Sequence, residues 1–161
     1  MIQKGLNPLL AGRTHRQSKP PIPEAQKIRF LIAHENQTIR KFIRGCLQDM
    51  GYLNVVDWIP GTAILGTLLD EKAHVLIVNG ESPDIQGWEM VRTLRSLAAT
   101  CKTKVMIVGG DSSKESIQDA IQAGVDDYII LPFSLSLFEK RITALFAKKS
   151  GKDEKSPVSS R

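Results

Sequence analysis

Short apolar runs recur through the middle of the chain, and most of them are continuous rather than alternating with polar residues. Each run contains at least two β-branched residues, which at this length favours a strand over a helix. Strands that are buried on both faces of a parallel sheet have this continuous apolar pattern. The runs occupy residues 28–33, 55–59, 75–78, 105–108 and 128–131.

Between these runs, apolar residues return at the spacing of one face of an α-helix. The clearest stripe follows the first run and ends at Gly51, a residue type that commonly ends helices. Ser112 and Glu115 have the spacing of a capping box, and Gly124 can close the helix that follows them. Ser134 can cap the last helix. The stripes are formed by Ile39, Phe42, Ile43, Cys46, Leu47 and Met50; by Ile64, Leu65 and Leu68; by Trp88, Val91, Leu94 and Leu97; by Ile117, Ala120 and Ile121; and by Leu135, Phe138, Ile142 and Leu145.

Five strand–helix units in succession predict an α/β protein with a doubly wound parallel sheet and helices on both faces. In such sheets the working site lies outside the carboxyl ends of the strands, at the point where the strand order reverses. The residues that directly follow the predicted strands are therefore the candidate site. They are His34 and Glu35, Asn79 and Gly80, Gly109 and Gly110, and Leu131 and Pro132.

Composition narrows the class of protein. The chain has 161 residues, of which 42% are hydrophobic and 24% are charged, as in a single globular domain. No apolar run approaches the ~18 residues that a membrane span needs, and the N-terminus lacks the apolar segment of a secretory signal. Cys46 and Cys101 do not make a disulfide framework, and no Cys/His cluster has zinc spacing. We therefore expect a reduced, cytoplasmic setting.

The net charge of +5 is concentrated at the two ends of the chain. Residues 1–26 and residues 148–161 each carry a net charge of +3, whereas the middle carries −1. With their prolines and polar composition, the ends predict a flexible basic tail at 1–26, a folded domain at 27–147 and a disordered basic tail at 148–161. Such tails can touch acidic surfaces, although solubility is the commoner role of their charge.

Four segments of the chain resemble the receiver domain of bacterial response regulators, over roughly residues 27–146. They read IRFLIAHENQTIRKFI, HVLIVNGESPDIQGWEMVRTLR, KVMIVGGDSS and AIQAGVDDYIILPFS. The resemblance implies the flavodoxin-like (βα)5 fold, with a five-stranded parallel sheet in the order 2-1-3-4-5. It also implies a cis peptide bond between Leu131 and Pro132.

The chemistry of that family depends on side chains that this chain lacks. In the family, an aspartate after the third strand accepts a phosphoryl group and holds Mg²⁺ together with two acids after the first strand. A hydroxyl residue and a lysine then contact the phosphoryl oxygens. The resemblance places at these positions Asn79 for the acceptor, His34 and Glu35 for the acids, Gly109 for the hydroxyl and Leu131 for the lysine.

These differences predict a site without phosphoryl chemistry. A primary amide is not a useful nucleophile toward phosphorus, and a single carboxylate makes a weak magnesium site. We therefore expect no catalytic residue and no cofactor. Glu35, Asn79 and Glu81 together form the one weak alternative for a metal ion.

The resemblance also assigns switch and partner positions. Tyr128 occupies the aromatic switch position, and it forms the switch and clamp set together with Gly109, Leu131 and Pro132. The family's partner-facing surface corresponds here to Lys114, Ile117 and Tyr128.

These observations predict a stand-alone pseudo-receiver in bacterial signal transduction. It would bind a protein partner, a signalling or motility component, without phosphorylation, enzymatic activity, a DNA-binding domain or a membrane span. One alternative is a small-ligand or nucleotide effector that uses the vacated acidic pocket or the basic tails, with Trp88, Arg92 and Arg95 as candidate contacts. A second alternative is a nucleic-acid or membrane contact through the tails, which salt would weaken steeply.

Overall fold

The computed structural model describes residues 23–147, so most of the two predicted tails lies outside the described residues. Five parallel strands form one sheet in the order β2-β1-β3-β4-β5, which confirms the predicted topology. All five predicted strands are present, and the register pairs Ala33 with Val78 and Asn79 with Val108. The strands are β1 (Phe30–Ala33), β2 (Val55–Asp57), β3 (Val75–Asn79), β4 (Lys104–Val108) and β5 (Asp127–Ile129).

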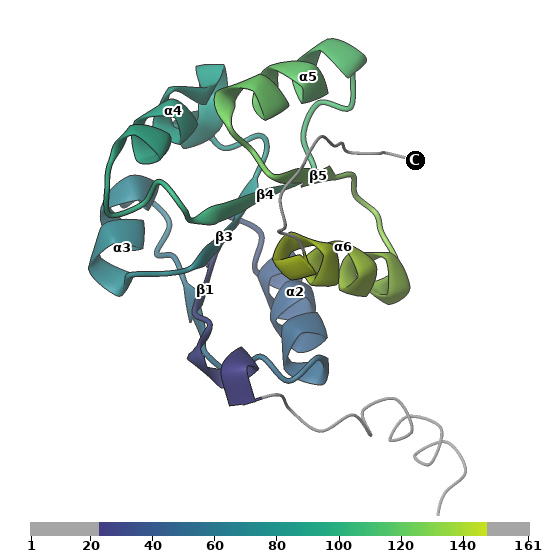
Figure 1. The fold of residues 1–161 in the computed structure, drawn as a ribbon. Helices are drawn as coiled ribbons and strands as arrows, with labels where there is room; N and C mark the ends of the chain where they lie inside the picture. The colour runs from purple at the N-terminus through teal and green to yellow at the C-terminus, as the bar shows by residue number, and fades with distance from the viewer. Residues whose placement is uncertain (1–22, 148–161) are drawn as a thin grey trace, which may run out of the picture.

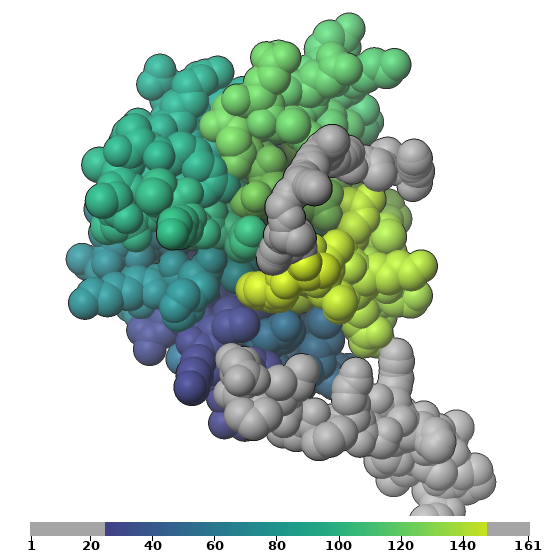
Figure 2. Space-filling view, in the orientation of Figure 1, coloured from purple at the N-terminus to yellow at the C-terminus, as the bar shows by residue number. Residues whose placement is uncertain are grey.

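Helices cover both faces of the sheet (Figure 1). On one face α2 and α6 pack on the side chains of Val75 and Ile77, and on the other face α3, α4 and α5 pack on those of Leu76 and Val78. Side chains fill the space between the ribbon elements (Figure 2). The helical elements are η1 (Pro23–Lys27), α2 (Gln37–Asp49), α3 (Ile64–Glu71), η2 (Pro83–Trp88), α4 (Glu89–Ser96), α5 (Lys114–Ala123) and α6 (Leu135–Ala147).

Side-chain caps explain where several helices begin. The Asn36 side chain accepts a hydrogen bond from the Ile39 amide at the start of α2, and Ser134 caps α6 as predicted. Ser113, not Ser112, caps α5, because its hydroxyl accepts the hydrogen bond from the Ser116 amide.

The folded part begins earlier than residue 27. Residues Pro23–Lys27 form the short 3-10 helix η1, which precedes β1 at the purple end of the ribbon (Figure 1). Ala25 within it is only 3% exposed, so this turn belongs to the packed domain rather than to the N-terminal tail. Among residues 23–147, no helix has both the length and the apolar character needed to cross a membrane.

Candidate functional site

The carboxyl edge of the sheet brings the predicted site residues together. His34 and Glu35 follow β1, and Asn79 is the last residue of β3. Gly109 directly follows β4, and Leu131 lies two residues beyond β5. Because β1 lies between β2 and β3, this edge is also where the strand order reverses.

Asn79 links the two sides of this site. Its side-chain Nδ2 donates a hydrogen bond of 2.7 Å to Oε1 of Glu35. Its Oδ1 accepts a 3.0 Å hydrogen bond from the backbone N–H of Glu81. Because the Glu81 N–H can only donate, it fixes the amide oxygen toward the loop and the amide nitrogen toward the Glu35 carboxylate.

These contacts do not suit a magnesium ion. A divalent cation needs several oxygen ligands, but the Asn79 group that faces Glu35 is a nitrogen with two protons. Glu81 reaches Asn79 through its backbone N–H, not through its carboxylate. Among the described residues, no group of three or more His, Cys, Asp or Glu side chains is placed to hold a metal ion. We therefore derive no chemistry through magnesium at this site.

His34 is buried at a position that the resemblance assigns to one of the two acids. It is 6% exposed, and its Nδ1 accepts a 3.1 Å hydrogen bond from the Asn36 amide. Burial lowers the pKa of His34 below 6.5, and this outweighs the opposing effect of the Glu35 carboxylate. The proton of the neutral ring is therefore on Nε2, which has no hydrogen-bond partner among the described residues. Arg40 holds the turn by donating to the backbone carbonyls of His34 and Glu35.

An aliphatic side chain covers the turn after β4. Gly109 has a φ of 83°, and a Cβ placed on it would lie 3.1 Å from Cδ1 of Leu131. A hydroxyl residue at this position would thus meet both backbone strain and the leucine. The Leu131–Pro132 peptide bond is cis, as the resemblance implied.

Tyr128 is packed inward against the same turn. Its side chain is 2% exposed, and its hydroxyl donates a 2.7 Å hydrogen bond to the backbone carbonyl of Asp111. Burial raises the pKa of the Tyr128 phenol. Tyr128 therefore lies beneath the predicted partner surface rather than on it, whereas Lys114 is exposed and Ile117 is half-buried.

The three contacts suggested for a small ligand do not converge on this site. Trp88 is buried in the core at 9% exposed, and Arg92 donates to the backbone carbonyl of Gly87. Arg95 lies on α4, and its guanidinium binds the backbone carbonyl of Gly124 and the Asp126 carboxylate rather than a residue of this site. The structure thus assigns structural contacts to these three side chains.

Sequence reasoning missed two groups that shape the site edge. Asp84 in η2 caps the start of α3 by accepting a 3.1 Å hydrogen bond from the Ile64 amide. Trp58 donates from Nε1 to the backbone carbonyl of Thr62 and closes the loop after β2. Only the Ser82-Pro83-Asp84 run gave a local signal, because Ser and Pro are typical of a helix start.

Comparison with known proteins places these observations in a family. Residues 30–143 match the model of the response regulator receiver domain. The chain is similar to the chemotaxis protein CheY of Pseudomonas aeruginosa, with 26% identity over 124 residues, which are 77% of this chain and all of that protein.

Solved structures show the same fold. Chemotaxis protein CheY4 of Vibrio cholerae superposes with a TM-score of 0.63 at 22% identity, covering 74% of this chain and 99% of that one. The receiver domain of the sensor histidine kinase PA1611 of Pseudomonas aeruginosa, which holds a magnesium ion in its active-site cleft, has a TM-score of 0.64 at 16% identity. That match covers 75% of this chain and 98% of the other. The chain belongs to the response regulator receiver domain family.

Proposed function

We propose that this receiver domain of two-component signalling works without phosphorylation. It is a pseudo-receiver whose output is the binding of a protein partner, and it is not an enzyme. The observation that carries the proposal is the 2.7 Å hydrogen bond from the Asn79 amide to the Glu35 carboxylate. Through this bond the Glu35 carboxylate, the one acid left among the family's site positions, already accepts from a side chain of the protein itself.

Two further contacts support the proposal. Leu131 packs over Gly109, so a phosphoryl group at Asn79 would find an aliphatic side chain where a cation would be needed. The Tyr128 hydroxyl is already held by the Asp111 carbonyl. These contacts are formed in the unmodified protein, so the proposed surface does not depend on a covalent modification.

The proposed partner surface is the exposed side of α5 with the end of β5. Lys114 is exposed there, and Ile121 and Ile130 are 36% and 38% exposed. Ile117, which is a residue of α5, packs against the core cluster that contains Tyr128. Apolar anchors with a charged rim are typical of protein interfaces. Because similar proteins are named for chemotaxis, we propose a signalling or motility component as the partner.

The first test is chemical. The full chain is incubated with acetyl phosphate and Mg²⁺, and its intact mass is measured. We expect no phosphate adduct on the wild type or on the conservative Asn79→Gln variant. A stoichiometric adduct that is lost in base, as acyl phosphates are, would contradict the proposal.

The second test concerns the partner surface. The full chain is used to capture partners from lysate of the cells that produce it, beside the variants Ile121→Glu and Lys41→Glu. Ile121 lies on the proposed surface, whereas Lys41 is exposed on α2, on the other side of the sheet. We expect Ile121→Glu to reduce capture at least fivefold and Lys41→Glu to leave it unchanged. Equal capture by both variants would place the interface elsewhere.

A further inference from the structure

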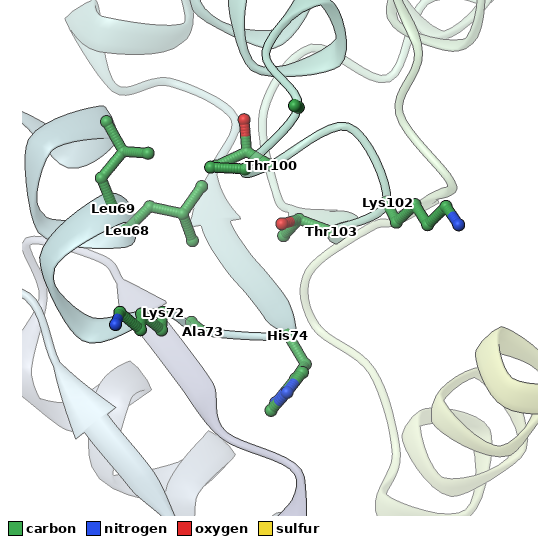
Figure 3. Close-up of a pocket in the computed structure, with 10 residues that line it drawn as sticks. Leu68, Leu69, Lys72, Ala73, His74, Thr100, Lys102 and Thr103 are labelled. Atoms are coloured by element: carbon green, nitrogen blue, oxygen red, sulfur yellow. The ribbon is translucent and has the colours of Figure 1, made fainter.

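A cavity of about 480 Å³ lies at the edge of the sheet opposite the vacated acid site. It is bounded by the end of α3, by the residues that lead into β3 and by the loop that leads into β4 (Figure 3). Cavities of this size are typical of small-molecule sites. The ten lining residues are Leu68, Leu69, Lys72, Ala73, His74, Ala98, Ala99, Thr100, Lys102 and Thr103.

Small and aliphatic residues form the hollow. The alanines at 73, 98 and 99 leave space that larger side chains would fill. Figure 3 shows Leu68 and Leu69 of α3 on one side, facing Thr100 and Thr103 on the other. No lining residue is a Phe, Tyr or Trp, so the imidazole of His74 is the one ring among the lining side chains and the wall is mainly aliphatic.

The rim of the cavity is positively charged. Lys72 and Lys102 stand at opposite ends of it, and both are exposed (Figure 3). None of the lining residues is acidic. The neighbouring acids Glu71 and Asp126 are engaged by Arg29 and Arg95, so within residues 23–147 the two rim lysines have no ion-pair partner.

Backbone contacts and geometry constrain two of the lining residues. Nδ1 of His74 accepts a 2.9 Å hydrogen bond from the Arg29 amide, so in the neutral ring the proton is on Nε2. The Lys72 backbone adopts a left-handed conformation with a φ of 54°, at a helix end where glycine is the usual residue. A lysine at this position accepts backbone strain and in exchange places a cation at the rim.

We propose that this cavity binds a small organic anion with an aliphatic body, such as a medium-chain carboxylate. The aliphatic chain lies against the leucines and alanines, and the head group lies at the rim beside Lys102, while Lys72 adds positive charge at the opposite end. Both tails of the chain itself have a net positive charge, so charge complementarity favours an anion from outside the chain over a tail. The site is separate from the surface in the proposed function, and its test does not depend on that function.

The test is a titration of the ¹⁵N-labelled full chain followed by amide chemical shifts. Octanoate, below its micellar concentration, is the probe; acetate carries only the head group, and octanol only the chain. We expect octanoate to give saturable shifts at residues 68–74 and 98–104, and acetate and octanol to bind at least fivefold more weakly. For octanol, which lacks the charge, this fivefold change corresponds to the loss of a partly exposed ion pair of up to about 1 kcal/mol.

Charge variants complete the test. We expect Lys102→Glu to weaken octanoate binding at least fivefold and Lys72→Gly to weaken it about threefold. Lys41→Glu on α2 makes the same charge change as Lys102→Glu away from the cavity and should leave binding unchanged. Circular dichroism checks that each variant is folded.

Three results would overturn the proposal. They are octanoate shifts that map outside the cavity, equal affinity for octanol and octanoate, and octanoate binding that is unaffected by Lys102→Glu. AMP is titrated in parallel, and binding of AMP without binding of octanoate would replace the aliphatic anion with a nucleotide and reject the class proposed here.

Discussion

Replacing Asn79 by aspartate converts a hydrogen bond into a repulsion. In the wild type the amide donates to a carboxylate oxygen 2.7 Å away, and the variant places a second carboxylate at that distance. A hydrogen bond to a charged group contributes about 1.5 kcal/mol or more to stability. We take this lower value because Glu35 is exposed to solvent. Repulsion of two unit charges at about 4 Å adds roughly 1 kcal/mol in water. We therefore expect Asn79→Asp to lower the free energy of unfolding by about 2.5 kcal/mol at pH 7.

The pH dependence of this loss has a definite sign. The repulsion requires both carboxylates to be ionised, and acid protonates carboxylates. The destabilisation is therefore full at neutral pH, and its repulsive part disappears as the pH falls below about 4. The double variant N79D/E35Q removes the repulsion and should recover about 1 kcal/mol at pH 7.

Urea unfolding followed by circular dichroism, with and without Mg²⁺, measures these effects. Two facing carboxylates supply the hard oxygen ligands that magnesium prefers, so Mg²⁺ should stabilise Asn79→Asp and leave the wild type unchanged. If Asn79→Asp is as stable as the wild type at pH 7 without Mg²⁺, the hydrogen bond from Asn79 to Glu35 does not stabilise the folded protein, and this prediction is wrong.

Three further outcomes follow from other contacts. Burial raises the pKa of Cys46 to about 11, so a thiol reagent at pH 8 should label Cys101 alone until denaturant is added. The free energy of unfolding should fall as the pH rises above about 9, because the thiol ionises first in the unfolded chain. Rapid labelling of both thiols in the native protein would contradict this. Lys72→Gly should raise the free energy of unfolding by about 1 kcal/mol in urea, because it relieves a left-handed backbone, and a loss of stability would be inconsistent with that strain. Arg95→Met should lower the free energy of unfolding by about 3 kcal/mol, because the Arg95 guanidinium binds three backbone carbonyls and a carboxylate. Arg92→Met removes one carbonyl contact and should lower it by about 1 kcal/mol. Equal losses of stability in the two variants would refute this difference.

Much of the fold follows from local patterns in the chain. The apolar runs predicted all five strands, and the central strands β1, β3 and β4 are buried along nearly their whole length, as expected of strands covered on both faces. The second run extends to Ile59 in the pattern, but the strand ends at Asp57. The Trp58 backbone N–H still donates to Ile32 of β1, and its side-chain Nε1 donates to the backbone carbonyl of Thr62 in the loop that follows. Apolar character alone does not distinguish a strand residue from a buried loop residue.

The site was predictable in position but not in its contacts. The rule that ligands bind at the carboxyl edge brought His34, Glu35 and Asn79 to one place. Which atom of the Asn79 amide faces Glu35 depends on the Glu81 backbone, and no local pattern encodes it. The cavity at the opposite edge also escaped prediction, because it arises where small residues of two separate loops meet a helix end.

The packing around Gly109 limits how this protein can change over evolutionary time. A hydroxyl residue entering there must adopt a φ of 83° and meet Leu131, and a side chain at Gly110 would lie 2.8 Å from the Tyr128 hydroxyl. Each step toward a phosphate-accepting site therefore lowers stability unless its neighbour has already changed. The order of substitutions at this turn is thus constrained, because Leu131 or Tyr128 has to change before residue 109 or 110 can accept a side chain.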